Sequence, residues 1–212
     1  MKRFFYLMAI VLIASCKKDN LDSTSGSGFI EDFLNINPKI AVGKTSESNV
    51  IYQGGVATYR GYIFKPLHGM KISAIGGRIA EFGTFKIEIY HINNSYLWGK
   101  DTLMIDSVNI NNINKFQYKN INHDLILIAN ERYLIRYFNK SHNSVYDAGL
   151  GYSQSNLLNI IRFPLKINDI EIEIPYYTYE ISSNAEYFTI TEETWNYGIL
   201  RGLVDFKYEL TK

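Results

Sequence analysis

The sequence predicts an all-β fold, an antiparallel β-sandwich of about nine strands with a jelly-roll-like arrangement. Apolar and polar residues alternate with a period of two through most of the chain after residue 28, and this is the side-chain period of a strand. Short segments rich in Asn, Gly, Asp or Pro separate the alternating runs, and these residues favour turns. Aromatic residues, which are enriched in strands, make up 15% of the chain.

The alternation is strongest at 170–181, where isoleucine and glutamate alternate from Ile170 to Ile174. Apolar side chains there face one side of the strand and carboxylates the other. Segments 31–34 and 125–131 are compatible with short helical turns, and the second is equally compatible with a strand. Connections of uneven length favour two packed sheets over a regular up-and-down barrel. The nine expected strands are 59–64, 70–79, 84–92, 102–110, 115–121, 132–138, 158–167, 170–181 and 203–210.

The composition indicates one ordered domain and excludes several classes of protein. Of the 212 residues, 46% are hydrophobic and 20% are charged, which suits a single core. The single cysteine excludes a disulfide framework and a thiolate metal cluster. Lys and Arg number 22 against 21 Asp and Glu, interspersed along the chain, so no basic face for a nucleic-acid partner is expected.

The first 16 residues have the pattern of a secretory signal peptide. Lys2 and Arg3 precede an apolar run over 4–14, which is shorter than the roughly 20 residues of a membrane-spanning helix. The run ends in Ile-Ala-Ser-Cys at 13–16, which resembles the lipobox of bacterial lipoproteins. The resemblance implies removal of residues 1–15 and acylation of Cys16, which holds such proteins on a membrane without a spanning helix.

The residues after Cys16 suggest a membrane localisation and a flexible tether. Lys17 stands where the inner-membrane retention signal of Gram-negative lipoproteins would resemble Asp, so the resemblance implies the outer membrane. The charged stretch 17–22 partly resembles the signal that directs some of these lipoproteins to the cell surface. Residues 16–28 are polar and rich in Ser and Gly, which is typical of a flexible tether. One β-sandwich domain is expected over 29–212.

Within this domain, a family resemblance rests mostly on the spacing of hydrophobic residues, with one glycine. The segments that carry it are 62–64, 69–76, 85–90, 98–103 and 131–137. These segments resemble an unannotated family of extracellular bacterial jelly-roll domains of unknown function. The resemblance covers 59–137, with a weaker echo at 204–206. It implies a jelly-roll fold. Members of the family often accompany carbohydrate-related modules, and the resemblance implies no catalytic residues.

The sequence shows no complete catalytic motif. The four histidines lie far apart and form no local ligand pair. The segment 151–155 begins like a nucleophile elbow around Ser153, but it lacks the closing glycine that the tight turn requires. No catalytic residue and no cofactor are therefore assigned.

A run of carboxylates is the only candidate for metal binding. Asp169, Glu171 and Glu173 are expected on one face of a strand, about 6.6 Å apart. One interpretation is a solvated face that discourages edge pairing. The other is a structural calcium site at Asp169 and Glu171, because calcium takes oxygen ligands in flexible geometry.

Aromatic side chains are the better candidates for ligand binding. Sugar rings stack on flat aromatic surfaces, and asparagine supplies both a donor and an acceptor for hydroxyl groups. The alternative is that the aromatics belong to the core or form cross-strand pairs. The candidates are Tyr96, Trp98, Tyr177, Tyr179, Trp195 and Tyr197.

These observations favour a lipid-anchored cell-envelope protein with a non-catalytic β-sandwich that binds glycan or a surface protein. One alternative is a lipid-anchored polysaccharide hydrolase, which two carboxyl groups converging in a cleft would favour. Another is a structural accessory subunit of an envelope complex, which a large exposed apolar patch would favour.

Overall fold

Antiparallel strands and one short helix make up most of the chain that the computed structural model describes. Twelve of these strands have three or more residues, so the expectation of about nine was too low. The surplus consists of the short strands β1, β8 and β12, whose sequences are too brief to show a clear alternation. The described residues are 27–45, 57–93, 100–139, 145–149, 161–181, 185–188, 197–198 and 200–211.

The helix α1 spans Phe29–Ile36. The longer strands are β2 (Ala57–Pro66), β3 (Met70–Arg78), β4 (Gly83–Ile92), β5 (Lys100–Ile110), β6 (Gln117–Leu127), β7 (Tyr133–Asn139), β11 (Ile170–Ile181) and β15 (Leu203–Leu210). The shorter strands are β1 (Ala41–Thr45), β8 (Val145–Gly149), β9 (Ile161–Arg162), β10 (Leu165–Ile167), β12 (Ala185–Phe188), β13 (Tyr197–Gly198) and β14 (Leu200–Arg201).

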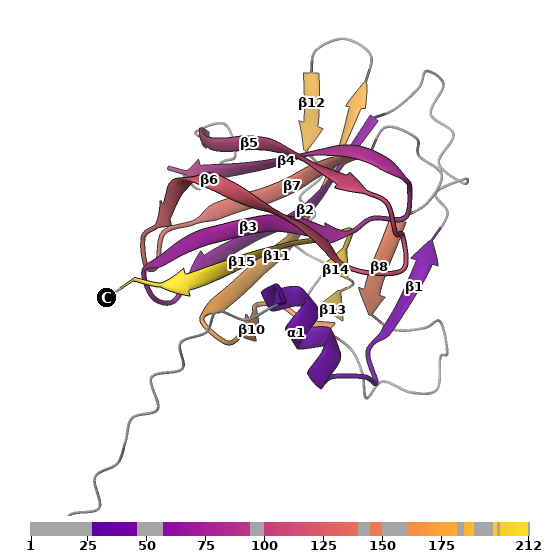
Figure 1. The fold of residues 1–212 in the computed structure, drawn as a ribbon, viewed down its shortest axis with the longest axis horizontal. Helices are drawn as coiled ribbons and strands as arrows, with labels where there is room; N and C mark the ends of the chain where they lie inside the picture. Colours follow the sequence, from indigo (N-terminus) through magenta and orange to yellow (C-terminus); the bar gives the residue numbers. More distant parts are fainter. Residues whose placement is uncertain are drawn as a thin grey trace, which may run out of the picture.

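Two antiparallel sheets pack face to face and form a β-sandwich (Figure 1). The larger sheet has the order β10-β11-β2-β7-β4-β5, with β12 paired to β11, and the smaller has the order β15-β3-β6. The chain passes from one sheet to the other between β2 and β3, β3 and β4, β5 and β6, and β6 and β7. Strands β1, β8 and β14 form a third small sheet at one end of the sandwich, and β9 pairs with β13.

The core lies between the two main sheets, where alternate side chains of each sheet meet. Phe64 of β2 and Phe206 of β15 are fully buried, and their ring centroids are 5.2 Å apart. A second buried cluster lies on the opposite face of the larger sheet, where Ile63 pairs with Leu134 and Leu134 pairs with Tyr90. Because both faces of the larger sheet are buried at this point, its strands contain longer apolar runs than a sheet with one solvated face would.

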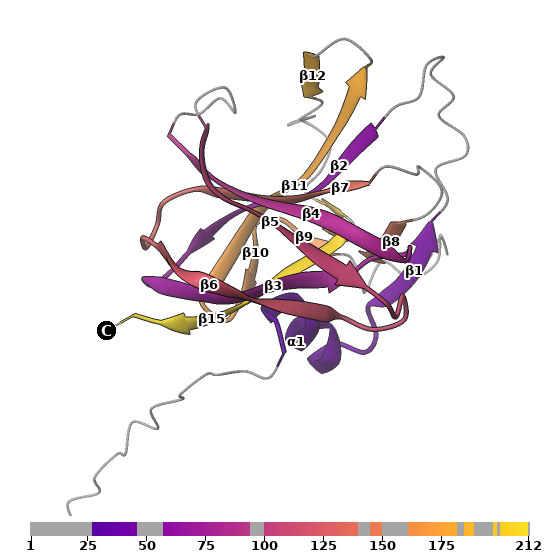
Figure 2. The same cartoon turned by 45° about the horizontal axis from the view of Figure 1, so that its top comes forward.

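The helix α1 lies beside β15, the edge strand of the smaller sheet (Figures 1 and 2). Its buried residues are Phe29, Ile30 and Phe33. The ring of Phe29 lies 4.7 Å from that of Phe206 and 5.8 Å from that of Tyr62, measured between centroids. The helix thus extends the expected turn at 31–34 in both directions, because its first residue belongs to the core.

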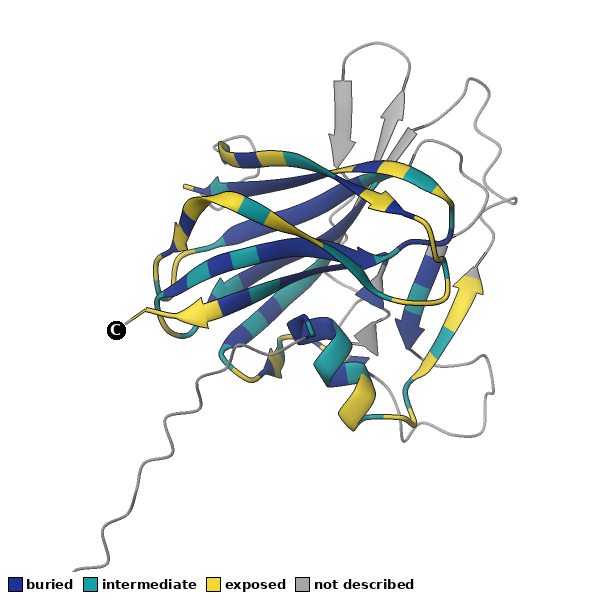
Figure 3. Cartoon of the chain, viewed as in Figure 1, coloured by how far each residue is buried: buried dark blue, intermediate teal, exposed yellow. Residues whose placement is uncertain are grey.

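Two further segments differ from the expected strands. Of the strand expected at 158–167, residues 158–160 lie outside the described residues. The rest is divided into β9 and β10, because Pro164 between them has no N–H to donate to a ladder. Segment 125–131 continues β6 as far as Leu127 and then turns, so the strand interpretation of its first part is confirmed. Burial alternates along the strands that face the sandwich (Figure 3). No helix in the described residues is long and apolar enough to cross a membrane.

Candidate functional site

The aromatic candidates divide into two groups in the structure. Three of the six, Tyr96, Trp98 and Trp195, lie outside the described residues, as does Cys16. Tyr177 and Tyr179 lie two positions apart on β11 and Tyr197 lies on β13, so the structure places their backbones in sheets. Their part in ligand binding remains a prediction.

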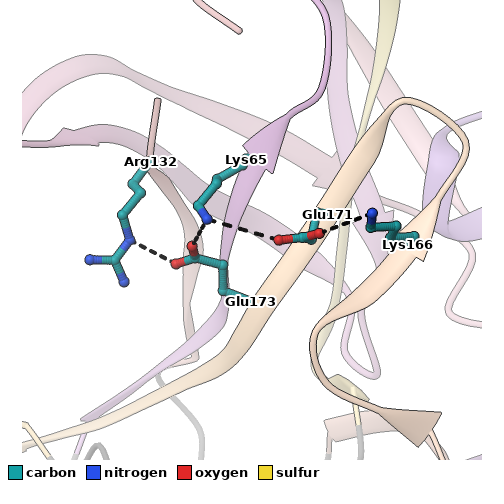
Figure 4. Close-up of polar contacts among 5 residues, drawn as sticks. All are labelled: Lys65, Arg132, Lys166, Glu171 and Glu173. Atoms are coloured by element: carbon teal, nitrogen blue, oxygen red, sulfur yellow. Dashed lines mark hydrogen bonds and ion pairs between the residues drawn. The ribbon is translucent and has the colours of Figure 1, made fainter. Parts of the chain in front are cut away.

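Two of the three carboxylates belong to an ion-pair cluster on β11 (Figure 4). The Glu173 carboxylate lies 2.5 Å from Lys65 Nζ and 2.7 Å from Arg132 Nε. The Glu171 carboxylate lies 3.9 Å from Lys65 Nζ and 3.7 Å from Lys166 Nζ. The carboxylates therefore point at cations of neighbouring strands, and the face is an ion-pair network that joins β11 to β2.

Asp169 lies in the turn between β10 and β11, apart from this cluster. Its carboxylate accepts a hydrogen bond from the Tyr208 hydroxyl at 3.1 Å and lies 3.8 Å from His68 Nε2. Within the described segments, no group of three or more His, Cys, Asp or Glu side chains is arranged to hold a metal ion. A calcium ion at Asp169 and Glu171 would have to compete with these polar and cationic neighbours.

The described residues form an open cavity of about 590 Å³, a volume typical of small-ligand sites. Four segments far apart in the sequence line it: α1, residues 38–42 leading into β1, the last residue of β3, and residues 114–116 before β6. Figure 1 shows these elements meeting where α1 and β1 approach the ends of β3 and β6. The sandwich thus forms a site at one end, beside its N-terminal helix.

The wall of the cavity combines an aromatic surface with amide groups. Phe116 lines it and its ring stacks on that of Tyr118, with centroids 6.4 Å apart and planes inclined by 12°. Asn35 on α1 and Asn114 on the loop before β6 also line it. This combination offers an apolar face together with hydrogen-bond donors and acceptors.

Arg78, the last residue of β3, is the principal cation of the cavity wall. Its guanidinium lies over the ring of Tyr146 at 4.2 Å, a cation–π contact that holds it in place. The Tyr146 hydroxyl donates a hydrogen bond of 3.3 Å to Asn114 Oδ1. One tyrosine on β8 therefore positions two polar side chains of the wall.

Asp205 of β15 fixes the helix that forms the other wall. Its carboxylate accepts hydrogen bonds from the backbone N–H groups of Ile30 at 3.1 Å and Glu31 at 3.0 Å, although it lies far from them in the sequence. These N–H groups belong to the first turn of α1, and the residue before the helix, Gly28, provides no side-chain cap. The Asp205 carboxylate therefore serves as the N-cap of α1 and positions Glu31 at the cavity.

Tyr118 connects Asp205 to Glu31. Its hydroxyl lies 2.8 Å from Asp205 Oδ2 and 3.0 Å from Glu31 Oε2, and it accepts a hydrogen bond of 3.0 Å from the Gly28 N–H. In the strand register, Asp205 pairs with Gly76 and Gly76 pairs with Tyr118, so a residue without a side chain lies between the two. The phenol therefore reaches the carboxylate across the middle strand of the sheet.

Burial dominates the electrostatics of this group. It raises the pKa of Asp205 to about 7, although four hydrogen-bond donors oppose the effect. Burial, together with the negative charges of Asp205 and Glu31, raises the pKa of Tyr118 well above its ordinary value. Tyr118 therefore keeps its single proton, which it donates to one of the two carboxylates at a time.

A second buried ionic group lies on the outer face of the larger sheet. Glu88 Oε2 accepts hydrogen bonds from Arg136 Nε at 2.6 Å and from the Tyr90 hydroxyl at 2.7 Å, and Glu88 Oε1 lies 2.7 Å from Lys86 Nζ. Burial raises the pKa of Glu88, but these partners outweigh it and lower the pKa below the ordinary value. The guanidinium of Arg136 also lies 3.7 Å from the ring centroid of Tyr59. This network is structural, since it ties β4 to β7.

None of the cavity residues was a candidate from the sequence. They are ordinary Asn, Arg, Lys and Phe residues without a shared motif, and only the crossing of the chain between sheets brings them together. Phe116 lies within the strand expected at 115–121, whereas in the structure β6 begins one residue later, at Gln117. Comparison of the chain with protein-family models, curated proteins and solved structures found no match.

Proposed function

We propose that this protein is a lipid-anchored binding protein of the outer membrane whose β-sandwich holds a glycan in the cavity beside α1. The proposal is carried by one observation. The wall of this open cavity of about 590 Å³ contains Phe116 together with Asn35 and Asn114. Sugars present apolar C–H faces and hydroxyl groups, which match an aromatic plane and amides respectively.

The rigidity of the wall also supports binding. Asn114 is held by the Tyr146 hydroxyl, and its own N–H donates a hydrogen bond of 3.0 Å to Asn112 Oδ1. Gln117 Nε2 donates a hydrogen bond of 2.7 Å to the Asn112 carbonyl, which closes the loop on itself. A wall that is already ordered loses little entropy when a ligand binds.

The chemistry of the wall favours binding over catalysis. Among the described residues that line the cavity, Glu31 is the only carboxylate, and no Ser, Cys or His is present. A glycosidase of the usual kind requires two carboxyl groups on either side of the scissile bond. The lipid anchor in this proposal comes from Cys16 and its lipobox, which places the domain at the membrane surface.

A glycan-array screen of the detergent-solubilised full chain tests the proposal. A hit is then titrated against Phe116→Ala, Trp98→Ala and Trp195→Ala. We expect Phe116→Ala to weaken binding by about tenfold or more, since stacking of one sugar ring on an aromatic face contributes about 1.4 kcal/mol or more. Loss in Trp98→Ala or Trp195→Ala alone would move the site to the aromatics expected from the sequence. If no neutral or acidic glycan on the array binds, glycan binding is contradicted.

A further inference from the structure

Positive charge exceeds negative charge in the wall of the cavity. Arg78 and Lys115 line it together with a single carboxylate, that of Glu31. The Glu31 carboxylate accepts a hydrogen bond from the Tyr118 hydroxyl at 3.0 Å, whereas neither cation forms an ion pair within the described residues. The wall therefore has a charge of +1, which a ligand with one negative charge would neutralise.

The Arg78 side chain is held by Tyr146 and keeps one unsatisfied hydrogen-bond donor. One face of its guanidinium is covered by the Tyr146 ring at 4.2 Å, and its buried Nε has no hydrogen-bond partner among the described residues. A buried donor without an acceptor is rare in folded proteins, because burial removes the water that would otherwise satisfy it. A guanidinium fixed by its face presents its N–H groups along its edge, in the fork geometry that matches a carboxylate.

Lys115 lies just before β6, the strand that pairs with β3, in a loop that is braced internally. Its backbone N–H donates to the Asn112 carbonyl at 3.4 Å, and Asn111 N–H donates to Gln117 Oε1 at 3.1 Å. The loop therefore keeps the exposed Lys115 near the cavity, where an ammonium group acts as a second, more flexible point charge.

We infer that the ligand of this cavity is an acidic glycan, and that Arg78 binds the carboxylate of a uronic acid residue while the ring of the sugar lies on Phe116. The inference rests on the proposed function, because it names the class of glycan bound in the same cavity. A planar carboxylate with one negative charge matches both the guanidinium fork and the charge of the wall.

Calorimetric titration of the detergent-solubilised full chain tests this inference. The probes are the methyl glycoside of galacturonic acid, which carries one carboxylate, the methyl ester of the same compound, and a disaccharide with one sulfate group. We expect the acid to bind about tenfold or more tightly than the ester, because the ester lacks the charge that pairs with Arg78. We also expect the affinity for the acid, and not for the ester, to fall as salt concentration rises.

The variants Arg78→Ala and Arg78→Lys identify the residue responsible. Arg78→Ala should remove the preference for the acid over the ester, and Arg78→Lys should restore part of it, because charge returns without the fork. Arg132→Ala is the matched control, since it removes a cation that is already paired with Glu173 and does not line the cavity. It should leave the preference unchanged, with thermal melting used to confirm that each variant is folded.

Several results would overturn the inference. An ester that binds as tightly as the acid, or a preference that survives Arg78→Ala, would show that the carboxylate is not recognised by this residue. A sulfated disaccharide that binds as tightly as the uronic acid would show recognition of oxyanions in general. Binding of neutral glycans alone would overturn this inference and leave the proposed function intact, whereas no binding of any glycan would overturn both.

Discussion

The backbone N–H of Ile30 donates a hydrogen bond of 3.1 Å to the carboxylate of Asp205, which lies 175 residues later in the chain. The helix α1 has only eight residues, too few to be stable alone, and its N-terminus lacks a local side-chain cap. The last strand of the domain therefore supplies the cap for its first helix. The wall of the cavity formed by α1 depends on this long-range contact.

The close packing of Gly28 against Asp205 and Tyr118 can be tested by substitution. A Cβ at Gly28 would collide with the Asp205 carboxylate and the Tyr118 hydroxyl, whereas a Cβ at Gly43 would meet nothing within 4 Å. We expect Gly28→Ala to lower the free energy of unfolding by about 2 kcal/mol, as overpacking does. Gly43→Ala is the matched control and should change it by no more than about 0.5 kcal/mol. Urea unfolding of both variants measures the difference, and equal effects would contradict the packing of Gly28 on Asp205.

The pKa of Asp205 predicts a dependence of stability on pH. Burial raises this pKa to about 7, from an ordinary value of 3.8. The folded chain therefore holds the proton more tightly than the unfolded chain does. The stability that this group contributes is fully present below about pH 4 and is lost as the pH rises through about 7. We expect the free energy of unfolding to fall across this window, by at most about 1.4 kcal/mol per pH unit from Asp205.

The variant Asp205→Asn separates this contribution from that of other groups. Asparagine does not titrate, so the difference in unfolding free energy between the wild-type chain and Asp205→Asn should change with pH between about 4 and 7. Unfolding by urea at a series of pH values measures this difference. A difference that stays constant over the whole range would show that Asp205 remains ionised in the folded chain.

The buried pair of Glu88 and Arg136 should contribute far more to stability than the half-buried cluster in Figure 4. Glu88→Gln leaves the charge of Arg136 buried without its partner, and we expect destabilisation by about 3 kcal/mol. Glu173→Gln is the control, because its partners Lys65 and Arg132 retain access to water, and we expect about 1 kcal/mol or less. Similar values for the two variants would contradict the difference in burial.

The pair also has a pH dependence of the opposite sign to that of Asp205. Since the partners of Glu88 lower its pKa below 4.5, its contribution is present above about pH 4.5 and is lost as the pH falls through the lowered value. The loss of stability of the wild-type chain below about pH 4.5 should therefore be smaller in Glu88→Gln, while the part that comes from Asp106 and Asp124, whose pKa values are also lowered, remains.

The lipid anchor is tested by the single cysteine. We expect Cys16→Ala to abolish incorporation of a labelled fatty acid and to move the protein from the detergent-rich to the aqueous phase on phase separation. Cys16→Ser is a useful second variant, because it preserves the size of the side chain but lacks the thiol from which the thioether to the lipid is formed. Retention of label in either variant would show that the lipobox resemblance does not describe the processing of this chain.

Many strands of the sandwich were predictable because apolar and polar residues alternate along them. The expected segments 70–79, 84–92, 170–181 and 203–210 lie within a residue or two of β3, β4, β11 and β15. The short strands β1 and β8 were missed, since five residues do not establish a period. Asp205 gave no sign of its role either, because an aspartate in an apolar run looks the same whether it faces solvent or a helix terminus.

The sequence by itself determined the class of fold, the approximate strands and the expectation of a lipid anchor at Cys16. Each of these depends on short-range order, either a period of two or the spacing of a few residues from a cleavage site. Only the tertiary structure decided that Arg78, Asn114 and Phe116 face one cavity and that Asp205 caps α1. The physical reason is that local alternation specifies which face a side chain occupies, whereas its partner depends on which strands become neighbours when the chain crosses between the sheets.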